Sequence, residues 1–284
     1  MTESKIKSGE RKMAEEIKSG TIMTVFSTAS AVGKTLLSIN MTAELAKSGY
    51  KVCVVDLDLQ FGDICNYLNI APQKTIYDFQ KNVENESSTL GCQDYITQYE
   101  YQGISFSVLA APLKLEEAYN ISTQAVSAIL AGLRSEYDYI VLDTTAAFSE
   151  LNLAAMDLST IITFVGIVDF IPTIKNMKVG YDTMRSIGYE KNKIRFVLNR
   201  NNSKTHIELQ DVEQLLEEHF YHVLPNDFFT AIDSLHKGVP LVIDRDETAL
   251  GRSLQDLIDK YTNRMRESDT PNVPLSSWMK KLFK

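Results

Sequence analysis

Residues 21–35 read TIMTVFSTASAVGKT, and this stretch decides the fold that the sequence predicts. Its apolar first half, TIMTVFST, is typical of a buried strand. A helical pattern follows and ends near Gly49, a residue suited to a helix C-terminal cap. The next segment, KVCVVDLDL (51–59), has the composition of a second buried strand. Strand, loop, helix and strand in this order predict a βαβ unit of a parallel sheet covered on both faces.

The same alternation continues along the chain. Residues 82–103 are polar, and we expect an irregular insertion or a helical excursion there. The pattern predicts an α/β fold with a doubly wound, mostly parallel sheet and helices on both faces. The further predicted strands are 104–112, 137–143, 161–169, 194–200 and 222–227, and the further helices are 122–134, 172–187, 208–219 and two helical patterns before Tyr261.

Composition sets the domain organisation and the compartment. A chain of 284 residues that is 44% hydrophobic can bury a large core, so we expect one α/β domain over 21–262. Residues 1–20 are predicted to be a polar arm, and 263–284 a linker with an amphipathic tail. Cys53, Cys65 and Cys92 form no CxxC pair and no even set, and the N-terminus lacks a signal-type apolar run, which predicts a cytosolic protein.

The net charge of −8 argues against a surface that binds nucleic acid through bulk positive charge. No stretch of the sequence approaches the roughly 18 apolar residues of a membrane span, so we expect any membrane contact to be peripheral.

The loop Thr28–Thr35 lies between the first strand and the first helix, where a phosphate-binding loop GxxxxGK[ST] lies, and it retains GKT. Lys34 sits at the positive end of a helix dipole, an unfavourable position unless an anion is bound there. We expect Lys34 to reach the β and γ phosphates of a nucleotide, Thr35 to bind Mg²⁺, and the amides of residues 32–35 to wrap the phosphate oxygens. The alternative is a plain turn and helix start with a solvated lysine.

Three aspartates end predicted strands. Asp56 and Asp58 close the second strand and Asp143 closes a later one, and ligands of open α/β sheets bind at this carboxyl edge. Such carboxylates suit a Mg²⁺ site, although strand-end aspartates also cap helices. Their occurrence together with GKT predicts a nucleotide site.

Read together, these residues resemble the MinD/ParA group of P-loop ATPases over about Thr21 to Tyr261. VVDLDLQFGD (54–63) is similar to the CpaE/TadZ branch, whose members help to place Flp/Tad pilus machinery at the cell pole. The resemblance implies ATP and Mg²⁺ as cofactors, a homodimer with nucleotide at its interface, pilus or secretion-machinery partners, and a location in the cytoplasm, on the inner membrane face or at the pole. The other matching strings are YDYIVLDTTAA (137–147), VLNR (197–200), LPND (224–227) and HKGVPLV (236–242).

The resemblance also implies roles for single residues. Lys34 and Asp58 would be catalytic, with Asp58 orienting the attacking water or acting in a switch, and Thr35, Asp56 and Asp143 would form the metal site. Asn199 would recognise the adenine edge, although an Asn in a left-handed turn at a strand end is the alternative. The nucleotide would contact Ser30, Ala31, Val32, Gly33, Lys34, Thr35, Leu36, Asn199 and Arg200, with Pro225 and Asp227 near the base.

The sequence departs from the usual loop of this group, GKGGxGKT, at residues 28–31. Ala29 stands where the group has a lysine that reaches the partner's nucleotide, and comparable residues are worth about 10³ to 10⁵ in rate in other phosphoryl-transfer systems. We therefore expect ATP binding with slow or absent hydrolysis. Alternatively, Lys175 or Lys178 replaces the missing charge.

The C-terminal segment LSSWMKKLFK has one apolar helix face, formed by Leu275, Trp278, Leu282 and Phe283 together with Met279. It is similar to the membrane-targeting tail of MinD, and folding back or docking to a partner is the alternative. The leading function is a CpaE/TadZ-type localisation or assembly ATPase. A MinD-like membrane-associated positioning ATPase and a ParA-like DNA partition protein are the alternatives, and a metabolic P-loop enzyme ranks last.

Overall fold

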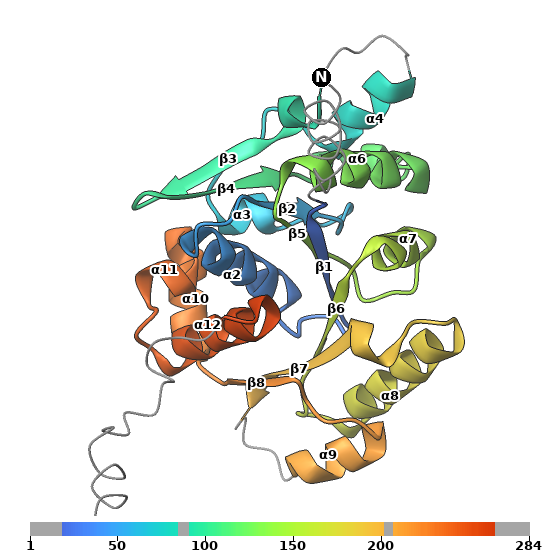
Figure 1. Ribbon diagram of the computed structural model, residues 1–284, viewed down its shortest axis with the longest axis vertical. Coiled ribbons are helices and arrows are strands. Elements are labelled where there is room, and N and C mark those ends of the chain that lie inside the picture. Colours follow the sequence, from blue (N-terminus) through green and yellow to red (C-terminus); the bar gives the residue numbers. More distant parts are fainter. Residues whose placement is uncertain (1–18, 85–90, 202–206, 265–284) are drawn as a thin grey trace, which may run out of the picture.

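In the computed structural model, which describes residues 19–84, 91–201 and 207–264, an eight-stranded sheet runs through the middle of the molecule (Figure 1). The strand order is β3-β4-β2-β5-β1-β6-β7-β8, and all neighbours are parallel except β3 and β4. The strands are β1 (Thr21–Phe26), β2 (Val52–Asp56), β3 (Thr97–Tyr101), β4 (Ile104–Leu109), β5 (Tyr139–Asp143), β6 (Ile161–Gly166), β7 (Ile194–Asn201) and β8 (His222–Pro225). The predicted doubly wound α/β class is confirmed.

Helices cover both faces of the sheet (Figure 1). One face carries α2 (Lys34–Lys47), α3 (Ile64–Tyr67), α10 (Phe228–Lys237), α11 (Leu241–Asp244) and α12 (Ala249–Thr262). The other face carries α4 (Ile76–Glu84), α5 (Leu115–Ala118), α6 (Thr123–Glu136), α7 (Glu150–Leu158), α8 (Ile171–Ser186) and α9 (Leu209–Leu216). Two short 3₁₀ turns, Cys92–Tyr95 and Lys191–Lys193, complete the described elements.

The central strands are apolar on both sides because each side meets helices. In β1, Met23 and Val25 pack into the core beneath α2 and α12, whereas Ile22 and Phe26 pack into the clusters on the opposite face. Successive side chains of a strand point to opposite faces, so a run of apolar residues fills both layers. This is the physical basis of the continuous apolar strings that predicted a parallel sheet.

All seven predicted strands are present, with ends shifted by a few residues. Gly49 has φ 87°, and its amide donates to the Ala46 carbonyl at 2.9 Å, which confirms the expected helix end. The prediction for 82–103 is confirmed where 82–84 end α4 and 92–95 form a 3₁₀ turn, but it is wrong for 97–101, which form the antiparallel edge strand β3. Only Tyr99 of the five strand residues is buried, so the strand has a weak apolar signal in the sequence.

The two helical patterns predicted before Tyr261 are present as α10 and α12, and the short α11 between them was not predicted. Pro240 precedes the short α11 and separates it from α10, which ends at Gly238 with φ 70°. The predicted polar arm and amphipathic tail lie outside the described residues.

Helix α8 packs closely on the loop after β1, through Gly180. A Cβ placed on Gly180 would lie 2.3 Å from Cγ2 of Thr28 and 3.2 Å from Phe164 Cζ. A contact under 3 Å forces a neighbour to move, so only glycine allows this approach of helix and loop.

We therefore expect Gly180→Ala to lower the free energy of unfolding by about 1–3 kcal/mol, although alanine favours helices. Thr28→Ser, which removes Cγ2, should recover a large part of that loss in the double variant. Chemical denaturation of the four proteins measures both effects, and strict additivity of the two substitutions would contradict the contact.

Candidate functional site

The loop between β1 and α2 (residues 27–33, the β1–α2 loop) has two left-handed residues, Ala31 with φ 59° and Gly33 with φ 95°. Gly33 is the N-cap of α2, so the chain turns there and aims the first amides of the helix at the space above the loop. A Cβ on Gly33 would lie 2.6 Å from Asn199 Nδ2, which excludes any larger residue without a shift of that side chain. Ala31 adopts the left-handed conformation at a cost of about 1–2 kcal/mol relative to a right-handed residue.

Two carboxylates meet beside this loop because of the strand register. Asp56 ends β2, Asp143 ends β5, and the two residues are directly paired across the parallel strands. Both are buried. Asp143 accepts a hydrogen bond from Ser38 Oγ of α2 at 3.0 Å. Asp56 accepts from the amides of Asp58 and Ile64, each at 3.2 Å, and thereby orders residues 57–63.

Burial governs the electrostatics of this cluster. Burial raises the pKa of Asp143 to about 6. Hydrogen bonds from Thr35 and Ser38 and the positive charge of Lys34 lower this pKa, but burial has the larger effect. Burial and the neighbouring Asp143 raise the pKa of Asp56 well above its ordinary value. Burial lowers the pKa of Lys34, whereas Asp143 and Asp58 favour its charged form. A lysine and a carboxylate that are both desolvated in this way form a site that an anion with a divalent cation would stabilise.

The end of β7 is tied to the β1–α2 loop. Asn199 Nδ2 donates to the Val32 carbonyl at 2.8 Å, and Arg200 Nη2 donates to the Ala31 carbonyl at 3.0 Å. Asn199 Oδ1 accepts from the Arg200 amide at 2.9 Å. The left-handed residue at this strand end is Arg200, with φ 57°, whereas the alternative reading placed Asn199 there.

These elements enclose a cavity of about 550 Å³ at the carboxyl edge of the sheet. Its lining includes most of the predicted nucleotide contacts and both predicted catalytic residues, Lys34 and Asp58: Ser30, Ala31, Gly33, Lys34, Thr35, Leu36, Asp58, Asn199, Arg200, Pro225 and Asp227. Val32, Asp56 and Asp143 are buried and do not line it. Residues from distant parts of the sequence, predicted from separate motifs, are therefore brought together.

The outer part of the cavity is apolar, and sequence reasoning missed it. Tyr67 of α3 lines this part together with residues of α10 and α12, namely Phe228, Ala231, Ile232, Leu235 and Leu250. The helical spacing of the residues in α10 was the available signal, because positions 228, 231, 232 and 235 share one helix face. Asp227 caps α10 by accepting from the Thr230 amide at 3.1 Å.

Neither lysine suggested as a substitute for the missing loop charge lies in this cavity. Lys178 is paired with Asp182 at 3.0 Å and with Glu217 at 3.2 Å, on the side of α8 that faces α9. Lys175 is exposed on α8 and does not line the cavity. Within the described residues, no group of three or more His, Cys, Asp or Glu side chains is arranged to hold a metal ion. A Mg²⁺ ion at Thr35 and Asp143 would therefore need ligand or water oxygens to complete its shell.

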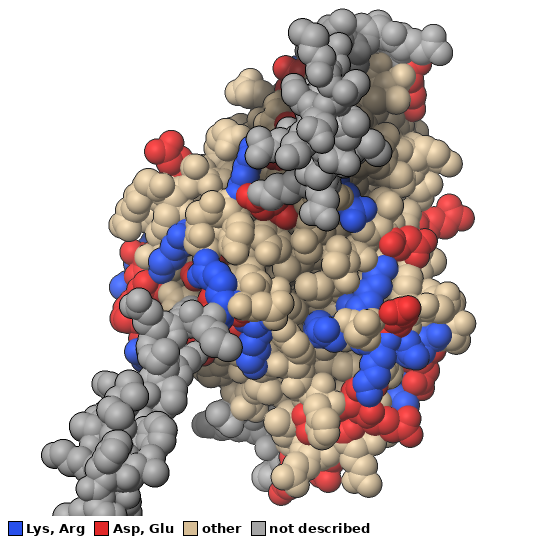
Figure 2. Space-filling model, viewed as in Figure 1, with Lys and Arg blue, Asp and Glu red and all other residues tan. Residues whose placement is uncertain are grey.

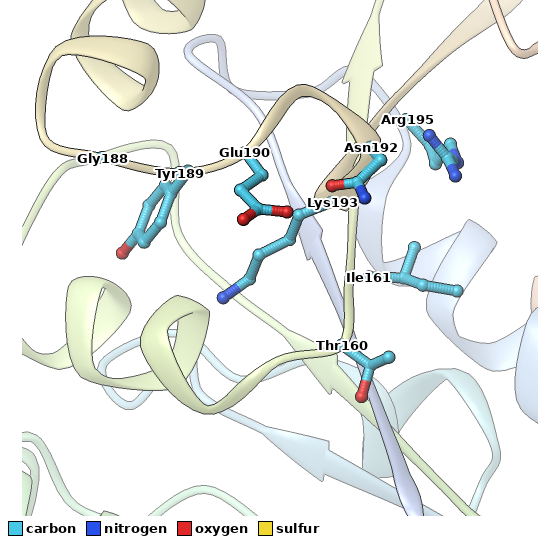
Figure 3. Close-up of a pocket in the computed structure, with 8 residues that line it drawn as sticks. All are labelled: Thr160, Ile161, Gly188, Tyr189, Glu190, Asn192, Lys193 and Arg195. Atoms are coloured by element: carbon cyan, nitrogen blue, oxygen red, sulfur yellow. The ribbon is translucent and has the colours of Figure 1, made fainter.

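A second cavity, of about 560 Å³, lies at the opposite edge, where β6 and β7 begin (Figure 3). Its cations are held by the protein: Lys193 donates to the Asp157 carbonyl at 3.2 Å, and Arg195 lies over the Tyr221 ring at 5.1 Å. Ligands of doubly wound sheets bind at the carboxyl edge, so the first cavity is the candidate site.

On the face drawn in Figure 2, Lys and Arg side chains alternate with Asp and Glu instead of forming a continuous basic surface. Among the helices of the described ranges, none is both long and apolar enough to cross a bilayer.

A family described as an AAA domain matches residues 20–180, more than half of the chain. The sequence is 24% identical to the septum site-determining protein MinD of Thermotoga maritima over 75% of each chain. The chain belongs to this AAA-domain family.

Solved structures of ParA and MinD proteins share the fold. A ParA family ATPase from Chlorobium tepidum superposes with a TM-score of 0.75 at 18% identity and covers 85% of this chain and 98% of its own. MinD from Pyrococcus horikoshii, solved as a complex with Mg-ADP, superposes with a TM-score of 0.72 at 20% identity. The match covers 85% of this chain and 96% of the MinD chain. The fold that the sequence resemblance implied is thereby confirmed.

The raised pKa of Asp143 makes a prediction about stability. An acid with a pKa of about 6 in the folded state, above its value near 4 in the unfolded state, binds more protons when folded. Ionisation of Asp143 therefore lowers the free energy of unfolding as the pH rises from about 4 to 6. This loss of stability persists at higher pH.

We expect Asp143→Asn, which keeps an acceptor for Ser38, to be more stable than the wild type by about 1–3 kcal/mol at pH 8 and equally stable at pH 4. Denaturant titrations of both proteins at the two pH values measure the difference. A stability difference that does not change with pH would rule out this electrostatic account.

Proposed function

We propose that the chain is an ATP-binding switch protein of the MinD/ParA type that takes Mg²⁺ with the nucleotide and hydrolyses it slowly or not at all. The supporting observation is the convergence of Lys34, Thr35, Asp58, Asn199 and Arg200 on one cavity beside two buried carboxylates. The solved MinD of Pyrococcus horikoshii is a complex with Mg-ADP, which supports a nucleotide with Mg²⁺ in the same fold.

Each part of the cavity has a chemical role in this proposal. The amides at the start of α2 and the Lys34 ammonium would hold the phosphates, and the Thr35 hydroxyl with the Asp143 carboxylate would position the hydrated Mg²⁺. Asp58, half-buried at the cavity wall, would orient a water. Mg²⁺ supplies neutralisation of phosphate charge when bound. The apolar part around Tyr67 and Phe228 would take the base, with Pro225 and Asp227 at its edge.

Slow turnover follows from the charges around the phosphates. Ala29 is half-buried against the core and brings no cation, and the loop residues 28–33 contain none. Phosphoryl transfer is accelerated chiefly by positioning and by positive charge on the transferred group. A protein with this loop is better suited to a switch that stays bound to ATP than to rapid cycles of ATP hydrolysis.

We also propose a homodimer that closes on the nucleotide edge. Large apolar side chains are exposed on loops and helix starts that follow the carboxyl ends of four strands: Phe61 (73% exposed), Leu113 (69%), Phe170 (66%) and Phe229 (85%). Apolar residues gathered at one edge are typical of an interaction surface. A second copy facing this edge would cover them together with the mouth of the cavity.

Two cellular roles fit this switch. The string VVDLDLQFGD (54–63) favours a CpaE/TadZ-type localisation or assembly factor for pilus secretion machinery. The sequence relative named above is a MinD protein, and so is one of the two superposed structures, which favours a MinD-like membrane-associated positioning ATPase at least equally. Pole foci in cells would support the first role, and oscillation or an even membrane coat the second.

Lys34→Ala should weaken binding of Mg²⁺-ATP by at least tenfold, because it removes the loop cation while the Thr35 hydroxyl remains. Isothermal titration of the two proteins measures this difference in affinity. Lys178→Ala is the control variant, because it also removes a lysine, but one whose ion-pair partners lie on α8 and at the end of α9. Equal affinity of wild type and Lys34→Ala would remove the phosphate site.

Sedimentation with ATP, ADP and no nucleotide tests the dimer. We expect a mass near two chains with ATP, and we expect Phe170→Ser with Phe229→Ser to reduce it, while the nucleotide affinity of the monomer, measured at low protein concentration, stays the same. Ile187→Ser, another exposed apolar residue (52%) beyond the end of α8, is the matched control. A mass that does not respond to nucleotide would reject the switch.

A further inference from the structure

Two cations line the carboxyl-edge cavity within the described part of the chain, Lys34 and Arg200. The same cavity is lined by Asp58, Asp63 and Asp227, so its walls carry more acidic than basic side chains. A nucleoside triphosphate adds several further negative charges. Close like charges oppose binding in a partly desolvated site, so the position of the second cation matters for phosphate affinity.

Arg200 is held against the β1–α2 loop by its backbone as well as by its side chain. Its left-handed conformation, φ 57°, turns the chain at the end of β7, and the guanidinium reaches the Ala31 carbonyl at 3.0 Å. Asn199 fixes the turn, because its amide donates to the Val32 carbonyl and its Oδ1 accepts from the Arg200 amide. Two consecutive loop carbonyls are thereby bound by two consecutive residues of β7.

The two bonds have an electrostatic consequence. A loop that binds phosphate through its amides must turn its carbonyl dipoles away from the anion or neutralise them. The guanidinium neutralises the Ala31 carbonyl, and the bond takes one of its five N–H donors, leaving a planar fork suited to phosphate oxygens. Ala31 is also the strained left-handed residue of the loop, so the Arg200 bond helps to hold a conformation that alanine resists.

We propose that Arg200 is the second phosphate-binding cation of this chain: it holds Ala31 in the anion-binding conformation and contacts the phosphate chain of the nucleotide. This inference rests on the proposed function and deepens it, because it assigns Arg200, one of the expected nucleotide contacts, to the phosphates. Ala29 does not supply a positive charge to the phosphates, and the inference assigns this role to Arg200 of the same chain.

The test compares Mg²⁺-ATP with adenosine as ligands of the wild type, Arg200→Gly and Arg200→Lys, by isothermal titration or by competition with a fluorescent ATP analogue. Glycine suits the left-handed position, so Arg200→Gly removes the side chain without adding backbone strain. We expect Arg200→Gly to weaken ATP binding about 10–100-fold, the worth of a charge-assisted hydrogen bond. We expect adenosine affinity to change less than about threefold, and Arg200→Lys to keep part of the ATP affinity.

Two further measurements separate charge from folding. Thermal unfolding of Arg200→Gly checks that the fold is intact, and Ala29→Lys in the Arg200→Gly protein should restore a large part of the ATP affinity. Equal losses for ATP and adenosine, or unchanged ATP affinity in Arg200→Gly, would overturn the inference. A wild-type protein that binds neither ligand would instead reject the proposed function, so the two failures are distinguishable.

Discussion

Two buried carboxylates and a half-buried lysine meet where β1, β2 and β5 end, and the site is arranged around them. Asp56 and Asp143 are neighbours because of the parallel register, and Lys34 follows the β1–α2 loop. Burial makes the charged forms of Asp143 and Lys34 costly. These desolvated charges lower the stability of the folded protein, and in the proposed function the bound phosphate and Mg²⁺ would compensate for this cost.

The second constraint is the shape of the β1–α2 loop. Three contacts fix it: Gly180 lets α8 approach Thr28, Asn199 binds the Val32 carbonyl, and Arg200 binds the Ala31 carbonyl. Ala31 adopts a conformation that glycine would adopt at lower cost, and the contacts from β7 compensate. The loop is therefore shaped by its surroundings more than by its own sequence.

Sequence reasoning found the elements that carry strong local signals. The buried strands 52–56 and 139–143 and the GKT start of α2 are visible because apolar runs and a helix N-terminus follow from short-range chemistry. The edge strand 97–101 was missed because only its Tyr99 is buried, and an edge strand pairs on one side only. The apolar part of the cavity was missed because Tyr67, Phe228 and Leu250 are separated in sequence and meet only after the sheet has formed.

The hydrogen bonds from the end of β7 to the β1–α2 loop show the same limit of prediction from sequence. VLNR identified residues 197–200 as part of the site, but the bonds of Asn199 and Arg200 to loop carbonyls depend on a left-handed turn that tertiary contacts impose. The lysines Lys175 and Lys178 lie at plausible sequence positions, yet α8 directs Lys178 towards α9 and its acidic partner. Side-chain direction, unlike element type, is set by the packed fold.

The central claim is that the cavity between β1, β7 and α10 receives a triphosphate with Mg²⁺, and a crystal grown with a non-hydrolysable ATP analogue and Mg²⁺ tests it most directly. The account predicts density for phosphates on the amides of residues 33–35, the metal between Thr35 and Asp143, and the base against Tyr67 and Phe228. An analogue bound elsewhere, or a cavity without ligand density at saturating concentration, would contradict it.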